Sequence, residues 1–257
     1  MIRRLWSHRY LVVSLIRRQF QLRYRQSAAG VAWAVLPPLV TVGAATVVFA
    51  EVAQVDTGAI PYPLFAFAAL TPWTFFASSL TFGVPSVVQN QQMVTRLAFP
   101  RAALPVSMIG LALVDLAIAG ATFVVFVYVT GSTIPLTALW FPVLLLVEMF
   151  LVVGVVLLGS ALNVFARDVK LAVPLLSQLW LFLTPVLYPL SEVPAGLRPW
   201  YQLNPMTGVV ESFRSILVIG EAPQLSVLLP SAAGAMILLL LGWWYFSAVE
   251  HRFADVI

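Results

Sequence analysis

The chain has 257 residues, of which 61% are hydrophobic and 9% are charged. Soluble domains carry about 25% charged residues, so this composition excludes an ordinary soluble fold and indicates an all-α integral membrane protein. The sequence contains no cysteine, which excludes disulfides, thiolate nucleophiles and cysteine-based metal sites.

Residues 1–30 form a cytoplasmic or interfacial segment, in which residues 9–26 are expected to make an amphipathic helix at the membrane surface. At about 100° per residue, one side carries Val12, Val13, Leu15, Ile16 and Phe20. The opposite side carries Ser14, Arg17, Arg18, Gln21 and Arg25, and Arg23 interrupts the apolar side. We interpret this helix either as a pre-membrane anchor or as part of a substrate entry site.

Long runs without charge follow, such as those between Asp56 and Arg96 and between Glu221 and Glu250. About 20 apolar residues suffice to cross a hydrocarbon layer of about 30 Å. We expect six transmembrane helices, near residues 31–50, 63–85, 104–130, 139–164, 171–190 and 226–248. They make a single domain over residues 1–257, with a six-helix bundle at 31–248 and a cytoplasmic tail at 249–257.

The basic residues predict the orientation of these spans. Six spans place twelve of the fourteen lysines and arginines on one face, with only Arg198 and Arg214 on the other. Because basic residues concentrate on the cytoplasmic side, both termini are predicted to be cytoplasmic. The net charge of +4 then reflects basic residues that set the orientation of the chain in the membrane. Attraction to anionic membrane lipid is a secondary role, and nucleic acid is not an expected partner.

The cytoplasmic connection at residues 89–101 mixes polar and apolar side chains. A short helix there would present Met93, Leu97 and Phe99 to a groove on a soluble partner. Composition alone favours an ordinary loop.

Two acidic residues lie inside the expected spans. At 1.5 Å per helical residue, Asp115 is about 17 Å from the cytoplasmic edge and Glu148 about 14 Å from the outer edge. No basic residue inside a span can pair with either of them. We interpret each as a neutral, hydrogen-bonded acid that faces the bundle, with proton coupling as the alternative.

The connection over residues 191–224 is too apolar for water, yet it is interrupted by Pro199, Pro205 and Gly208. Broken helices persist at membrane depth only where protein or a wet cavity covers them. We expect re-entrant outer helices between the fifth and sixth spans, containing Asn204, Pro205, Glu211 and Arg214. Glu211 and Arg214 are three residues apart, which predicts a local ion pair.

The sequence lacks the motifs of common enzymes. It has no G-x-x-x-x-G-K-[ST] loop and no G-x-G pair, and its two histidines, His8 and His251, lie outside the spans. We therefore expect no ATP hydrolysis, cofactor or metal chemistry in this chain. The exception would be an acid-dependent glycosyltransferase, which would need outer acids such as Glu51 and Asp56.

Several stretches resemble, in the same order, the sequence blocks of one transporter family. They are RYRQSAAGVAWAVLPPL (23–39), PYPLFAFAALTPWTFF (61–76), LAFPR (97–101), ALNVFARDV (161–169), QLWLFLTPVLYP (178–189), LNPMTGVVESFR (203–214) and the tail RFADVI. On these blocks the chain is similar to the ABC-2 type exporter permeases of O-antigen, teichoic acid and related polysaccharides or polyol phosphates. Ala29 and Ala69 stand where that family usually has leucine and glycine, and Glu148 has no family role to inherit.

The resemblance implies a bacterial cytoplasmic membrane protein that works as a homodimer with two copies of a separate ATPase subunit, which binds ATP and Mg²⁺. It also implies a substrate glycan carried on undecaprenyl diphosphate. A coupling helix would correspond to residues 89–100, which replaces the loop that composition favours. The residues expected to contact the ATPase are Met93, Arg96, Leu97, Phe99 and Arg101.

Two sets of residues would then handle the lipid-linked glycan. Aromatic rings stack on sugars, and the candidates to line a channel at the dimer interface are Trp73, Phe76, Trp180, Phe182 and Tyr188. At most half of these are expected to do so, because Trp and Tyr also form interfacial belts. Arginine suits a diphosphate, and the candidates are Arg23, Arg25 and Arg167, although positive-inside topology alone would also place them there.

Three other functions stay open. An ABC-2 permease for a small drug or simple lipid would bind the same kind of ATPase and ignore glycan. A membrane glycosyltransferase would depend on Glu51 or Asp56. A proton-coupled carrier would depend on Asp115 or Glu148 and would need no ATPase.

Overall fold

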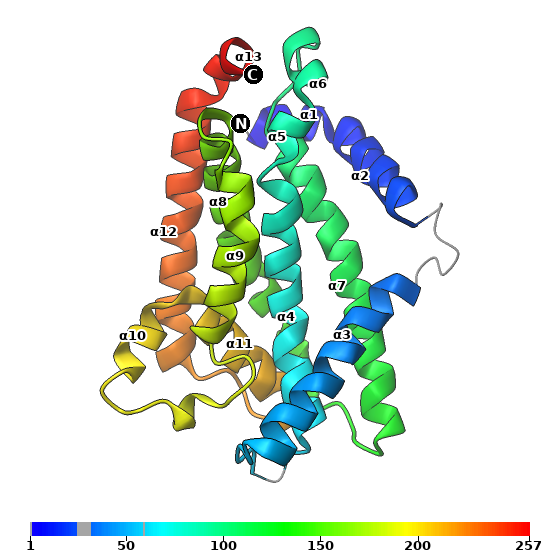
Figure 1. Ribbon diagram of the computed structural model, residues 1–257, viewed down its shortest axis with the longest axis vertical. Helices are drawn as coiled ribbons and strands as arrows, with labels where there is room; N and C mark the ends of the chain where they lie inside the picture. Colours follow the sequence, from blue (N-terminus) through cyan, green and yellow to red (C-terminus); the bar gives the residue numbers. More distant parts are fainter. Residues whose placement is uncertain (1, 25–31, 59) are drawn as a thin grey trace.

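The computed structural model describes residues 2–24, 32–58 and 60–257, and every regular element in these ranges is helical (Figure 1). The long elements are α3 (Ala32–Ala45) continued by η1 (Thr46–Val52), α4 (Tyr62–Gly83), α7 (Ala103–Val129), η2 (Leu136–Trp140) continued by α8 (Phe141–Phe165), and α12 (Leu225–Val249). The short elements are α1 (Ile2–Ser7), α2 (Arg9–Tyr24), α5 (Ser86–Gln89), α6 (Gln91–Arg96), α9 (Val169–Phe182), η3 (Leu190–Glu192), α10 (Arg198–Leu203), α11 (Pro205–Arg214), η4 (Ser215–Ile219), η5 (Glu250–Arg252) and α13 (Phe253–Val256).

Five segments are long and apolar enough to cross a membrane. They are Val35–Val52, Tyr62–Gly83, Ala103–Val129, Leu136–Phe165 and Leu225–Val256. These confirm the all-α class and five of the six predicted spans. The predicted span at residues 171–190 differs, because α9 has 14 residues and covers about 21 Å at 1.5 Å per residue. Its helix stops at Phe182 because Pro185 follows closely and lacks the backbone N–H that a further turn would need.

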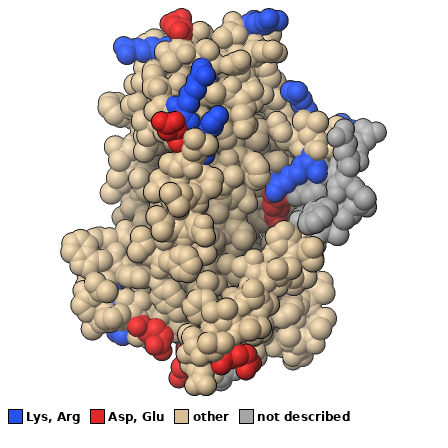
Figure 2. All heavy atoms as spheres, in the orientation of Figure 1, with Lys and Arg blue, Asp and Glu red and all other residues tan. Residues whose placement is uncertain are grey.

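The two ends of the bundle differ in the elements that they carry. In Figure 1, α1 and α13 lie at the upper end together with α5 and α6, whereas α10 and α11 lie toward the lower end. Figure 2 shows blue side chains mainly toward the upper end, where some red side chains accompany them, and a further group of red side chains at the lower end. The surface between the ends is largely tan, apart from one blue and red pair at mid-height on one side. A belt with few charges between two charged ends is the surface expected of a protein that spans a bilayer.

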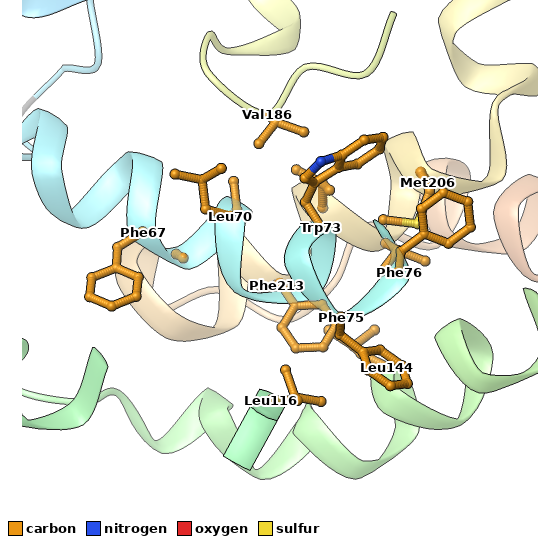
Figure 3. Packing of buried hydrophobic residues seen from close by; sticks show 14 of the residues in the cluster. Phe67, Leu70, Trp73, Phe75, Phe76, Leu116, Leu144, Val186, Met206 and Phe213 are labelled. Carbon is orange, nitrogen blue, oxygen red and sulfur yellow. The ribbon is translucent and has the colours of Figure 1, made fainter. Parts of the chain in front are cut away.

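Helix α4 is the centre of the bundle. Seventy-eight per cent of its apolar window is buried, against 17–39% for the other four long segments. Phe67, Phe75 and Phe76 are each at most 1% exposed, and Figure 3 shows them among residues from α7, α8 and α11. The outer faces of the remaining long helices are left for lipid or for another subunit.

Helix α2 lies against α7 with part of its apolar side. Leu15 is buried, and Ile16 packs where a side chain at Gly110 would otherwise lie. Arg17 and Arg18 are exposed, as the amphipathic pattern predicts. Val13 was predicted on the apolar side but is 61% exposed, because the contact with α7 covers only a strip of that side.

Helices α8 and α12 approach each other so closely that their backbones touch. A Cβ at Gly154 would overlap the backbone of Leu238, and a Cβ at Gly242 would overlap the carbonyl of Gly154. Small residues at such crossings allow the close helix packing that stabilises bundles in lipid. These two glycines therefore fix how α8 and α12 pack.

We expect Gly154→Ala and Gly242→Ala each to lower the midpoint of thermal unfolding, because the added methyl group collides with backbone atoms that side-chain rotation cannot move. Overpacking of this kind costs about 1–3 kcal/mol. Gly120→Ala in α7 is the matched control, since no atom lies within 4 Å of a Cβ built there. Scanning fluorimetry of the detergent-solubilised protein measures all three variants, and equal midpoints would contradict the close crossing.

Candidate functional site

The irregular segment after α9 is held by side chains from other elements. Arg214 of α11 is 1% exposed, and its Nη2 donates to the carbonyls of Pro185 at 2.7 Å and Val186 at 2.8 Å. Its Nη1 donates to Glu211 Oε1 at 2.7 Å, so the ion pair predicted from the sequence is present. The guanidinium carbon also lies 3.7 Å from the ring centroid of Phe65 in α4. One arginine thus joins α4, α11 and the broken end of α9.

Asn204 makes a second set of contacts with this segment. Its Oδ1 accepts from the backbone N–H of Met206 at 3.1 Å and from Trp180 Nε1 at 3.0 Å. Its Nδ2 donates to Thr184 Oγ1 at 2.8 Å. Asn204 therefore caps the N-terminus of α11, with Pro205 at the first helical position, and ties this cap to the end of α9.

Most backbone carbonyls of residues 182–187 accept a hydrogen bond from a side chain. Besides those bound to Arg214, the carbonyl of Leu187 accepts from the Tyr62 hydroxyl at 2.8 Å, and that of Phe182 accepts from the Tyr188 hydroxyl at 2.6 Å. The Nδ2 of Asn204 lies 3.3 Å from the carbonyl of Leu183. Backbone that leaves the helix at membrane depth needs such donors, because lipid offers none.

Helix α11 enters the bundle rather than lying on its surface. Eight of its ten residues are buried, and it packs against α4, α8 and α12. Next to it is a cavity of about 460 Å³. Its lining is rich in polar side chains, including Arg198, Gln202, Glu211, Ser212, Glu221 and Gln224.

A charged crevice lies between α2, α3, α4 and α7. Arg23 Nη1 is 2.6 Å from Asp115 Oδ2, and the Arg23 guanidinium carbon is 4.7 Å from the ring centroid of Phe82. The crevice has a volume of about 160 Å³, and Thr74 and Ser78 add hydroxyl groups to its lining. This ion pair corrects the prediction of a neutral Asp115 bonded within the bundle. The pair forms because α2 leans along α7 and brings its last turn to the middle of that helix.

Glu148 is enclosed in the bundle. Its side chain is 0% exposed, and neither carboxyl oxygen has a hydrogen-bond partner among the residues that the structure describes. The prediction that it faces the bundle is confirmed, whereas the predicted hydrogen bond is not found within this part of the chain.

The predicted channel aromatics divide into two groups. Trp73 and Phe76 are 5% and 0% exposed and point into the packing of α4 in Figure 3, so the prediction that they line a channel is wrong for this conformation. Sequence reasoning missed this because α4 is enclosed on all sides. The rings of Trp180 and Phe76 are nearly perpendicular, at 80°, with centroids 5.0 Å apart. Phe182 is 54% exposed, and Tyr188 is half-buried.

The other predicted diphosphate-binding arginines are not gathered with Arg23 in one cluster. Arg167 is exposed in the turn between α8 and α9, whereas Arg23 lies beside α7. Arg25 falls outside the described residues. Glu51 and Asp56, which were predicted to lie on the outer face, are exposed, and Asp56 Oδ1 accepts from the backbone N–H of Gly58 at 2.8 Å.

The predicted coupling segment forms the short helix α6 and the turn that follows it. Leu97 is 58% exposed and Arg96 is exposed, whereas Met93 and Phe99 are half-buried and pack on the cluster around Val94. The side chain of Arg101 donates to the carbonyl of Glu250, which links this turn to the C-terminal helices.

Next to this turn is a cavity of about 480 Å³ that sequence reasoning missed. It is lined by His8, Ala98, Phe99, Pro100, Arg101, Glu250 and His251. The two histidines are near opposite ends of the sequence, so no local pattern could have placed them together.

The family model described as ABC-2 type transporter matches residues 10–218. The chain belongs to the ABC-2 type transporter family. It is 29% identical to the O-antigen export system permease protein RfbA of Myxococcus xanthus over 260 residues, which cover 100% of this chain and 99% of that protein. It is 28% identical to the O-antigen export system permease protein RfbA of Klebsiella pneumoniae over 249 residues, which cover 96% and 95% of the two chains.

Family membership makes this ABC-2 chain a multi-pass membrane subunit of a transporter rather than an enzyme. The match begins in α2 and ends in η4. It therefore includes the charged crevice, the α6 turn and the Arg214 cluster, so these features belong to the transporter domain itself.

Replacing Arg214 with leucine is expected to destabilise this ABC-2 subunit by about 3–5 kcal/mol, because Glu211 and two backbone carbonyls lose their buried partner. The matched control is Arg198→Leu, which removes an exposed arginine that also donates to two carbonyls, those of Val193 and Ser191. That change is expected to cost about 1 kcal/mol or less. Thermal unfolding in detergent compares the variants, and equal losses would contradict the role given to Arg214.

Proposed function

We propose that this chain is the permease of an ABC exporter that moves a polysaccharide carried on undecaprenyl diphosphate across the bacterial cytoplasmic membrane. The main support is that relatives named as O-antigen export permeases align with it from end to end. A short drug-type or simple-lipid substrate is not favoured by these relatives. The glycosyltransferase and proton-carrier alternatives are not favoured either, because the family is one of transporters that are driven by ATPases.

In this proposal, the short helix α9 and the residues after it complete a sixth crossing. Helices α8 and α12 run in the same direction in Figure 1, so the chain has to return between them. With six crossings both termini are cytoplasmic, and the end with α1, α6 and α13 faces the cytoplasm. Helices α10 and α11 are then re-entrant elements at the outer end, which fits the burial of α11.

The working assembly is a homodimer with two copies of an ATPase subunit that holds ATP and Mg²⁺. A second permease would cover the apolar face of α9, where Leu171, Leu175 and Leu179 are 69%, 60% and 53% exposed. The glycan would pass along Trp180, Phe182 and Tyr188, which retain surface for stacking on sugars. The polar outer cavity near Glu211 offers hydroxyl, amide and carboxylate groups that match the hydroxyls of a sugar.

The diphosphate would enter beside Arg23, which is exposed at the mouth of the charged crevice. Arg25 and Arg167 remain further candidates. ATP-driven closure of the partner would reach the bundle through α6 and the turn up to Arg101, because this segment combines an exposed tip with buried anchors.

The proposal is tested by co-expressing the chain with the ATPase encoded beside it and purifying the complex in lipid nanodiscs. We expect a two-plus-two complex whose ATP hydrolysis changes when undecaprenyl-diphosphate-linked glycan is added. A complex that ignores this lipid would contradict glycan export and favour a drug or simple-lipid permease. If no complex formed, the ATP-driven mechanism would be wrong.

Leu97→Asp is expected to weaken association with the ATPase by about tenfold or more, because it places a charge on an exposed apolar anchor of the interface. The matched control is Leu136→Asp, which changes a residue that is 83% exposed in η2 at the other end of the bundle. Co-purification and the ATPase response to glycan lipid measure the effect. Unchanged coupling in Leu97→Asp would rule out this segment as the docking site.

A further inference from the structure

The ion pair between Arg23 and Asp115 joins residues 92 positions apart and crosses from the surface helix α2 to the middle of α7. Asp115 is the twelfth residue after Ala103, which begins α7, so it lies about 18 Å along that helix. The Arg23 side chain is 37% exposed and that of Asp115 is 18% exposed. The arginine is therefore the more accessible partner, at the edge of a crevice within an apolar bundle.

Charges at such a depth are costly, and an ion pair there contributes little to stability because desolvation offsets the attraction. The apolar contacts of Leu15 and Ile16 already attach α2 to the bundle. The pair is thus poorly explained as an anchor. Its accessible arginine, the ring of Phe82 and the hydroxyl of Ser78 are instead groups that suit a site for phosphate oxygens. The hydroxyls of Thr41 and Thr74 also line the crevice but donate to the carbonyls of Pro37 and Thr71.

In this arrangement the carboxylate of Asp115 occupies Nη1 of the Arg23 guanidinium, which is one of the two nitrogens that a phosphate group would use for a bidentate contact. A phosphate that binds Arg23 through both terminal nitrogens has to displace Asp115 from Nη1, and this adds the same penalty for every ligand. The attraction to the arginine, in contrast, grows with the charge of the ligand. A phosphodiester such as that of phosphatidylglycerol has one negative charge, and a diphosphate diester has two.

We infer that Asp115 is a built-in competitor that competes with lipid phosphates for Arg23. The abundant single phosphates of bulk lipid do not displace it, whereas a diphosphate-bearing lipid does. The inference rests on the proposed function and deepens it, because it names the residue that keeps bulk lipid from filling the site of the substrate headgroup. In an anionic membrane, an arginine without this competitor would be occupied by bulk lipid much of the time. With Asp115 in place, only a ligand with more than one negative charge is attracted to Arg23 strongly enough to offset the cost of displacing Asp115.

The test uses the full-length chain in nanodiscs, with undecaprenyl diphosphate as the probe, and compares neutral phosphatidylcholine with phosphatidylglycerol mixtures. In neutral nanodiscs, Asp115→Asn is expected to bind the probe about tenfold more tightly than the wild type, since no charge-assisted hydrogen bond has to be given up. Adding phosphatidylglycerol is expected to remove most of this gain, whereas the wild type changes by less than about twofold.

The matched controls separate charge from structure. Asp115→Glu keeps the competitor and is expected to behave as the wild type, and Arg23→Gln is expected to lose binding in both membranes. Arg18→Gln removes the same charge from the exposed side of α2 and is expected to leave binding unchanged. Asp115→Ser provides the same comparison if Asp115→Asn does not fold, as checked by thermal unfolding.

Two results would overturn the inference. In one, Asp115→Asn binds the probe no more tightly than the wild type, which would make Asp115 a structural partner of Arg23. In the other, phosphatidylglycerol competes equally with the probe in both proteins. Competition by inorganic pyrophosphate alone would assign the crevice to a free anion instead of a lipid headgroup. If the ATPase complex ignored glycan lipid while Asp115→Asn still gained affinity, the proposed function would fail and the competitor role would stand.

Discussion

The structure depends on one constraint, which is that backbone groups at membrane depth find their hydrogen bonds within the protein. The long helices meet it internally, but the chain leaves the helical path after Phe182. There the carbonyls of Phe182, Leu183, Pro185, Val186 and Leu187 accept from the side chains of Tyr188, Asn204, Arg214 and Tyr62. The break is therefore an ordered element, and the burial of α11 follows from the need to bring these donors to it.

The two ends of the bundle differ in how many buried hydrogen bonds hold them together. The end that carries α10 and α11 is held together by buried polar contacts around Arg214 that would be costly to break. The opposite end has an exposed tip at Leu97, and Arg23 on the side of the bundle is accessible in its ion pair with Asp115. Rearrangement during transport is therefore expected to begin at the basic end, where fewer buried hydrogen bonds have to be broken.

Side-chain contacts were predictable only where they are local in sequence. The ion pair of Glu211 and Arg214 follows from a spacing of three on one helix and is present. The pair of Arg23 and Asp115 spans 92 positions, so no periodicity indicated it, and the absence of a basic residue inside the spans suggested a neutral acid instead. Trp73 and Phe76 have a composition suited to a channel, yet the central position of α4 places them in the core.

The sequence by itself determined the class of protein, five of the long helices and the concentration of basic residues at one end. These follow from hydropathy and from charge, which act through each segment's own composition. Only the tertiary structure decided that α9 ends early, that α4 is the enclosed helix and that α2 brings Arg23 to Asp115. Those outcomes depend on which surfaces meet, because packing and long-range hydrogen bonds are properties of pairs of segments and not of any one of them.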